Sequence, residues 1–344
     1  MNDAIYEKNN QTLARYFKDK KIIITGATGL IGSRIAYFLD NLNYSFNSNI
    51  EIFCLYKDDM KKNYIFKSLK SHSNFHFYYF DSLEPNLPDF YADYIIHCAG
   101  ISGGSKLHLT NPVRVIDVAL IGTKYLFDFC VKNSIKSFLF VSSYEVYGNN
   151  SDFQNIIDES SPCFLDTMII RNIYAEAKRL CESMGVAYSK QYGLSFYSGR
   201  LTSTFGNGVK YNDNRFFAEF ARCYIENRDI VLKSKGLTMR SYLDADDAAS
   251  AFLFILMNGS NCNSYNLANE ENLISIINIA KLFVELSNNK IKVKFELPEE
   301  NSSFRAEGKT VIDSTKLKEL GWKPVYSFDE TIIKLINSMK ESIQ

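Results

Sequence analysis

The sequence predicts an α/β fold, in which a doubly wound parallel sheet is joined to a smaller C-terminal lobe. Short apolar runs without strict alternation recur as far as Arg200, as expected for strands that are covered on both faces. Helical patterns separate these runs, which favours parallel strands with right-handed crossovers. The alternation stops near Thr204, and a chain of 344 residues exceeds what one core usually supports.

The elements follow from these patterns in chain order. Strands are expected at 22–25, 50–55, 75–80, 94–98, 138–142 and 194–200, and helices at 33–43, 112–133 and 174–192. Beyond Thr204 we expect a helix at 215–227, strands at 230–232 and 290–295, and a buried helix at 248–257. The ligand crevice of such a sheet lies at the carboxyl ends of its strands.

Composition excludes several classes of protein. The chain has 39 basic and 39 acidic residues and no long basic run, so no nucleic-acid partner is expected. Its apolar runs are too short to span a bilayer. The first residues are too polar for a signal peptide, and seven scattered cysteines indicate reduced thiols. We therefore expect a cytoplasmic protein without membrane contact.

No metal site is predicted. His72, His76 and His108 lack the spacing to cysteines or carboxylates that metal ligands need. His97 follows a buried strand and is expected to be satisfied in the core.

The most informative segment runs from Lys21 to Arg34, KIIITGATGLIGSR. Its apolar run leads into Gly26, Gly29 and Gly32, and an amphipathic helix follows. The glycines allow a sharp turn and close approach of a pyrophosphate, while the helix N-terminus offers free N–H groups and a positive dipole end. This pattern predicts a dinucleotide site at the turn.

A second constellation carries chemistry. Tyr174 and Lys178 are four residues apart on a predicted helix and share one face. An ammonium beside a phenol lowers the tyrosine pKa and makes it a usable base. Ser143 ends a predicted strand and is expected to hydrogen-bond the same substrate oxygen.

The ordered motifs resemble the extended short-chain dehydrogenase/reductases. They are the glycine turn, Asp81, the stretch 97–100, Gly122-Thr123, the stretch VSSYEVYG at 141–148, Tyr174/Lys178, Arg200 with 204–206, the stretches 240–242 and 266–268, and Asp313 with 320–324. The resemblance is to the NAD-dependent nucleotide-sugar epimerases, dehydratases and decarboxylases, in particular to the UDP-glucuronate decarboxylase and NDP-sugar 4,6-dehydratase branch.

That resemblance implies a Rossmann-like domain at 19–203, to which segments near 238–268 return. It implies a substrate-binding lobe at 204–344, while residues 1–18 form a helical extension expected to pack on the sheet edge. Bound NAD would oxidise C4 of a nucleoside-diphosphate sugar to a 4-keto intermediate, and dehydration, decarboxylation or epimerisation would follow. Tyr174 would take the C4 hydroxyl proton, Asp81 would receive the adenine amine, and Lys178 would reach the nicotinamide ribose.

The implied site residues form three groups. The catalytic residues are Ser143, Tyr174, Lys178 and Glu145. The cofactor-binding residues are Gly26, Thr28, Gly29, Leu30, Ile31, Gly32, Tyr56, Lys57, Asp81, Ser82, Ala99, Gly100, Tyr174 and Lys178. The substrate-binding residues are Ser102, Ser143, Tyr144, Ser203, Arg215 and Arg240.

Glu145 discriminates best between reactions. Several dehydratases and the decarboxylases of this group have glutamate there, so it would take the C5 proton or act on C6; the alternative is a capping or solvated carboxylate. Arg240 matches an arginine that handles substrate phosphate or carboxylate. Tyr144 and Ser203 depart from the family pattern, so the resemblance does not identify a particular substrate for this chain.

The nicotinamide cofactor is expected to be NAD, with NADP as the alternative. The usual ribose-binding carboxylate is replaced by Tyr56, and Lys57 offers a cation, but Asp58 and Asp59 follow and would repel a 2′-phosphate. An NADP-dependent keto-sugar reductase and a dinucleotide-sensing binding protein are the rival functions.

A homodimer is also expected, because two helices carry more apolar positions than one sheet contact needs. These positions are Val115, Val118, Leu126 and Phe129 on one helix, and Leu180, Met184 and Ala187 on the other.

Overall fold

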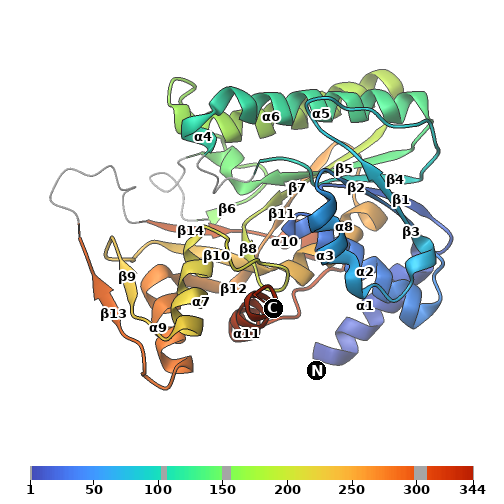
Figure 1. Cartoon of the computed structure of the whole chain (residues 1–344). Helices are drawn as coiled ribbons and strands as arrows, with labels where there is room; N and C mark the ends of the chain where they lie inside the picture. The colour runs from blue at the N-terminus through green and yellow to red at the C-terminus, as the bar shows by residue number, and fades with distance from the viewer. Residues whose placement is uncertain (1, 102–106, 149–155, 298–307, 344) are drawn as a thin grey trace.

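A seven-stranded parallel sheet forms the centre of the molecule (Figure 1). The computed structural model describes residues 2–101, 107–148, 156–297 and 308–343. The strand order is β11-β7-β5-β4-β1-β2-β3, and the predicted α/β fold is confirmed. The bounds are β1 (Lys21–Thr25), β2 (Glu51–Tyr56), β3 (Phe75–Tyr79), β4 (Tyr94–His97), β5 (Ser137–Ser143), β7 (Ser195–Leu201) and β11 (Asn263–Leu267).

Helices cover both faces of this sheet (Figure 1). α2 (Leu30–Phe46) and α8 (Ala245–Asn258) lie on one face, and α5 (Pro112–Lys132) and α6 (Ile173–Tyr192) on the other. Successive residues of β1 point to opposite faces, so Ile24 packs in the first core and Ile23 in the second. Burying each such side chain contributes roughly 1.5–3 kcal/mol.

Local signals set the ends of these helices. The Asn111 side chain accepts a hydrogen bond from the Arg114 N–H, and Pro112 opens α5. The cap satisfies one free N–H group of the first turn, and proline has no N–H group that needs a partner. Gly193 ends α6 in the left-handed conformation, with φ of 73°.

The N-terminal helix α1 (Asn2–Tyr16) packs against α2 and α8. The prediction that it covers the sheet edge is wrong, since the edge strands are β11 and β3. The reason is that Leu13 and Phe17, both fully buried, join the core that α2 and α8 share.

A second, mixed sheet and three helices lie beside the large sheet. The sheet contains β12 (Asn269–Ser275), β10 (Met239–Asp244), β14 (Lys309–Ile312), β6 (Ile156–Ile157) and β8 (Ser203–Phe205). β9 (Ile230–Leu232) pairs with β13 (Val293–Phe295). The helices α7 (Phe216–Glu226), α9 (Ile276–Leu286) and α11 (Phe328–Glu341) share a core that contains Phe217, Phe283 and Leu335.

Short helical segments complete the described chain. They are α3 (Asp59–Ile65), α4 (Leu107–Thr110), α10 (Thr315–Glu319), and the 3-10 turns η1 (Phe66–Ser68), η2 (His72–Asn74), η3 (Tyr144–Tyr147) and η4 (Ile170–Asn172). The proposed domain bounds stay a prediction, although α8 and β11 do return the chain to the large sheet. No helix among the described residues has the length and apolarity needed to cross a membrane.

Three of the four α5 side chains named for a dimer contact serve the protein's own core instead, and Val118 is half-buried. Val115, Leu126 and Phe129 are buried beneath α5, because that face of the helix rests on the sheet. The exposed apolar residues of α5 and α6 include Val113, Ile121, Val131, Leu180 and Val186.

Candidate functional site

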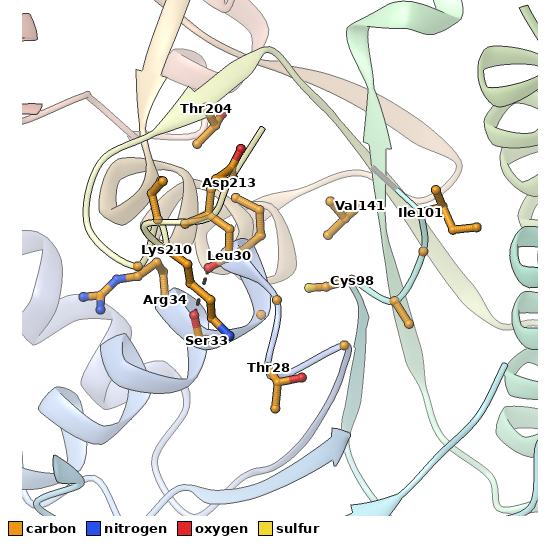
Figure 2. A pocket seen from close by; sticks show the side chains of 18 of the residues that line it. Thr28, Leu30, Ser33, Arg34, Cys98, Ile101, Val141, Thr204, Lys210 and Asp213 are labelled. Carbon is orange, nitrogen blue, oxygen red and sulfur yellow. Dashed lines mark hydrogen bonds between the residues drawn. The ribbon is translucent and has the colours of Figure 1, made fainter. Parts of the chain in front are cut away.

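A cavity of about 1420 Å³ opens at the carboxyl ends of β1, β4 and β5 and is lined from the other side by β8, β10 and α11. Figure 2 shows part of its lining. The structure brings every described residue of the predicted site to this cavity: Gly26, Thr28, Gly29, Leu30, Ile31, Gly32, Tyr56, Lys57, Asp81, Ser82, Ala99, Gly100, Ser143, Tyr144, Glu145, Tyr174, Lys178, Ser203, Arg215 and Arg240. Ser102 lies outside the described residues.

The glycine turn has the geometry that a pyrophosphate requires. Gly26 has φ of 60°, and a Cβ there would lie 2.8 Å from the Ala99 backbone. A Cβ on Gly32 would lie 2.4 Å from the Gly26 carbonyl oxygen. Gly29 opens α2 without a side-chain cap, so the first N–H groups of the helix are left for a ligand. These residues fit a dinucleotide.

A buried histidine ties two strand ends together next to this turn. His97 Nδ1 lies 2.6 Å from Thr25 Oγ1, and Nε2 lies 2.9 Å from Thr123 Oγ1. Burial lowers the pKa of His97 to about 3, so the ring is neutral. Thr25 Oγ1 also accepts a hydrogen bond from the Ala99 N–H at 3.0 Å. The prediction of a satisfied core histidine is confirmed.

Tyr174, Ser143 and Lys178 meet at the end of β5. Burial raises the pKa of Tyr174, the nearby Glu145 carboxylate raises it further, and hydrogen bonding with Ser143 opposes the shift. The Lys178 ammonium donates to the Val141 carbonyl at 2.7 Å and lies 5.9 Å from the Tyr174 ring centre.

The prediction that Lys178 lowers the pKa of Tyr174 is therefore wrong for the protein without a ligand. The ammonium is directed to β5, and burial of the phenol is the largest influence on its pKa, which it raises. Burial also lowers the pKa of Lys178. A Cβ on Gly100 would lie 3.7 Å from the Lys178 ammonium, so this charge faces the loop after β4.

Two arginines pair with the residues that follow Ser143. Arg171 Nη1 donates to Glu145 Oε2 at 2.9 Å, and Arg240 Nη1 donates to the Tyr144 phenol oxygen at 3.2 Å. The Glu145 N–H donates to Ser143 Oγ at 3.2 Å, which fixes the turn η3. The Glu145 carboxylate is thus an ion-paired group inside the cavity rather than a freely solvated one.

The other charged residues of the predicted site are also paired. Lys57 forms an ion pair with Asp81, the residue expected to receive the adenine amine. Burial opposes the shift, but hydrogen bonds from Lys57 and the Leu83 N–H lower the pKa of Asp81. Asp58 caps α3 through the Lys61 N–H, and Arg215 forms a two-pronged pair with Asp213.

Several charged residues of the cavity were not predicted from the sequence, among them Arg171 and Lys210. Arg171 stands three residues before Tyr174, a spacing that could have drawn attention to it. Lys210 lies in the polar loop after β8, where no local pattern marks it. Among the described residues no group of three or more metal-ligating side chains is found.

The fold and the cavity define a dinucleotide-binding α/β protein with a tyrosine–lysine–serine set beside the glycine turn. Residues 22–268 match the model of the NAD dependent epimerase/dehydratase family. The chain belongs to that family, whose description names NAD as cofactor.

Known relatives are similar over most of the chain. The dTDP-D-glucose 4,6-dehydratase of Dictyostelium discoideum is 28% identical over 296 residues, which is 78% of this chain and 62% of that protein. The UDP-glucuronic acid decarboxylase 1 of Danio rerio is 25% identical over 94% of this chain and 74% of that protein. The chain thus spans less than two thirds of the first of these relatives.

Solved structures share the fold. The UDP-glucuronic acid 4-epimerase of Bacillus cereus in complex with NAD has a TM-score of 0.78 at 19% identity, covering 94% of this chain and 100% of that one. The dTDP-glucose 4,6-dehydratase of Bacillus anthracis in complex with NAD has a TM-score of 0.74 at 18% identity, covering 94% and 97%.

Proposed function

We propose that this protein oxidises C4 of a nucleoside-diphosphate sugar with bound NAD and then reacts the 4-keto intermediate further. The observation that carries the proposal is the meeting of Ser143, Tyr174 and Lys178 with the uncapped turn of α2 in one cavity. The named relatives, a 4,6-dehydratase and a decarboxylase, and the 4-epimerase of similar fold support it.

In the first half-reaction, Tyr174 takes the proton of the C4 hydroxyl as the C4–H bond breaks and the C4 carbonyl forms. Ser143 hydrogen-bonds the same oxygen and holds it next to the phenol. Lys178, whose ammonium lies near Gly100, would hold the nicotinamide ribose. NAD, when bound, would supply the hydride acceptor and a positive ring charge that favours the phenolate of Tyr174.

In the second half-reaction, Glu145 takes the C5 proton, which the C4 carbonyl has made acidic, or acts on C6. Arg171 donates to this carboxylate and holds it in the cavity. Arg240 binds an anionic group of the substrate, either a phosphate or a carboxylate. Because the Glu145 carboxylate can carry out this second step, we favour dehydration or decarboxylation over simple epimerisation.

We also propose NAD rather than NADP, since Asp81 neutralises the Lys57 cation that would favour a 2′-phosphate. Denaturing the purified protein and identifying the released dinucleotide checks this, and recovery of NADP contradicts it.

A cytoplasmic homodimer is proposed as well. Val113, Ile121, Leu180 and Val186 leave an exposed apolar face on α5 and α6, which a second copy would cover about a two-fold axis. A monomeric mass by light scattering at micromolar concentration contradicts the dimer.

The function is tested by incubating the purified protein with UDP-, dTDP-, GDP- and CDP-sugars without added cofactor, followed by mass spectrometry. Loss of water identifies a dehydratase, loss of carbon dioxide a decarboxylase, and an isomer of unchanged mass an epimerase. A strict requirement for NADPH indicates the keto-sugar reductase instead, and binding without turnover indicates a sensor.

A further inference from the structure

Lys210 lies in the loop after β8 and lines the cavity together with residues of the first turn of α2. Figure 2 shows its side chain in the same part of the lining as Leu30, Ser33 and Arg34. The loop backbone itself touches the helix, because a Cβ on Gly208 would lie 3.2 Å from both Leu30 Cδ1 and Arg34 Cδ. A residue distant in sequence therefore lines the proposed cofactor end of the cavity.

The loop that carries Lys210 is held from two sides. The Gly208 N–H donates to Ser338 Oγ at 2.9 Å, and the Tyr211 N–H donates to Ser342 Oγ at 2.9 Å, so α11 and its C-terminal cap fix the loop. Arg222 Nη1 of α7 donates to the Tyr211 carbonyl at 2.6 Å. A side chain on a fixed backbone loses less freedom when it binds a ligand.

Lys210 differs from Arg34 and Lys57, which line the same cavity, in lacking a carboxylate partner among the described residues. Arg34 pairs with Asp246 at 2.5 Å, and Lys57 pairs with Asp81. Within the described ranges no ion pair of Lys210 is found. Burial lowers the pKa of Lys210, the Lys61 cation lowers it further, and Asp58 opposes the shift. A half-buried ammonium beside another cation is stabilised by an incoming anion.

We propose that Lys210 binds a phosphate oxygen of the dinucleotide, as a cofactor ligand supplied by the loop that α11 holds. This inference rests on the proposed function, which places the dinucleotide at the glycine turn. The phosphate has two sources, the pyrophosphate shared by NAD and NADP or the 2′-phosphate of NADP. Lys210 would add a point charge to a site otherwise built from backbone N–H groups.

The test compares dinucleotide release from wild type, Lys210→Gln and Lys67→Gln. Lys67 lines the same cavity, but its ammonium lies over the Tyr64 ring at 4.9 Å, so this control removes the same charge from the same rim. Each protein is loaded with NAD or with NADP, and release after dilution is followed by chromatography of the freed nucleotide. Equal melting temperatures of the unloaded proteins verify that the variants are folded.

Lys210→Gln is expected to release the dinucleotide about tenfold faster, the effect of one lost charge-assisted hydrogen bond, while Lys67→Gln behaves as wild type. If release of both dinucleotides is accelerated equally, Lys210 binds the pyrophosphate. If only the release of NADP is accelerated, Lys210 binds the 2′-phosphate. Release from Lys210→Gln at the wild-type rate, or equal acceleration in both variants, overturns the inference alone. A wild type that retains neither dinucleotide overturns the proposed function and this inference with it.

Discussion

The two ends of the cavity are built in different ways. At the cofactor end, the turn from Gly26 to Gly32 offers backbone N–H groups and space, and its residues are neighbours in sequence. At the end where we propose that the sugar binds, here called the sugar end, Arg171 meets Glu145 and Arg240 meets Tyr144, side chains brought together from separate segments. The first end suits a ligand common to a whole family, whereas the second can change with the substrate.

This difference implies that the two ends are separable by mutation. Changes among the side chains of the sugar end should alter chemistry while the dinucleotide stays bound. Changes in the turn should release the dinucleotide while the proton-transfer groups stay in place.

The largest effect is expected at Tyr174. Tyr174→Phe should lower turnover by about 10²–10⁴-fold, the usual contribution of a general acid–base group, while the folded protein keeps its dinucleotide. Lys178→Met should cost at least as much, because it removes a ribose contact and the buried charge together. Turnover numbers and nucleotide content of the purified variants check this; near-normal turnover of Tyr174→Phe removes the phenol from the mechanism.

A smaller effect, on dinucleotide affinity rather than on turnover, is expected at the glycine turn. Gly26→Ala places a Cβ 2.8 Å from the Ala99 backbone at φ of 60°, and strain of this kind costs roughly 1–3 kcal/mol. We expect dinucleotide affinity to fall about 5–150-fold, measured by titration with NAD. Unchanged affinity would show that the turn does not hold the cofactor.

The smallest effect concerns stability at low pH. The folded-state pKa of His97 is about 3, below its ordinary value of 6.5. Between these values the unfolded chain binds a proton that the folded chain does not, so stability falls as the pH drops through this window. Melting temperatures from pH 7 to pH 4 should therefore decline more steeply for wild type than for His97→Gln, by several degrees. Parallel declines would contradict a buried neutral ring.

The same contrast explains what the sequence could and could not predict. The glycine turn and the pair Tyr174/Lys178 are short local spacings, so their presence in one cavity followed from the strand order. The direction of the Lys178 ammonium depends on the Val141 carbonyl, a tertiary contact, and the prediction about the tyrosine pKa was wrong for that reason. Lys210 is placed by serines of α11 far along the chain, so no local pattern indicates it.

The strands of the second sheet were not predicted. β8 and β14 are three and four residues long, too short for a period to emerge, but β10 and β12 are six and seven residues long, so length does not account for them. The pairing of β8 and β14 with β10 supplies the wall that carries Ser203 and Arg240.

We infer that Glu145 acts after C4 oxidation, at an end of the cavity distinct from the cofactor turn. The most direct test mixes Glu145→Gln, with its bound NAD, with the nucleotide sugar that wild type converts, and follows near-ultraviolet absorbance and product together. We predict that reduced nicotinamide forms at close to the wild-type rate and persists, while product release slows by about 10²-fold or more. Reduction that slows in step with product release would contradict the claim and leave Glu145 a binding or structural residue.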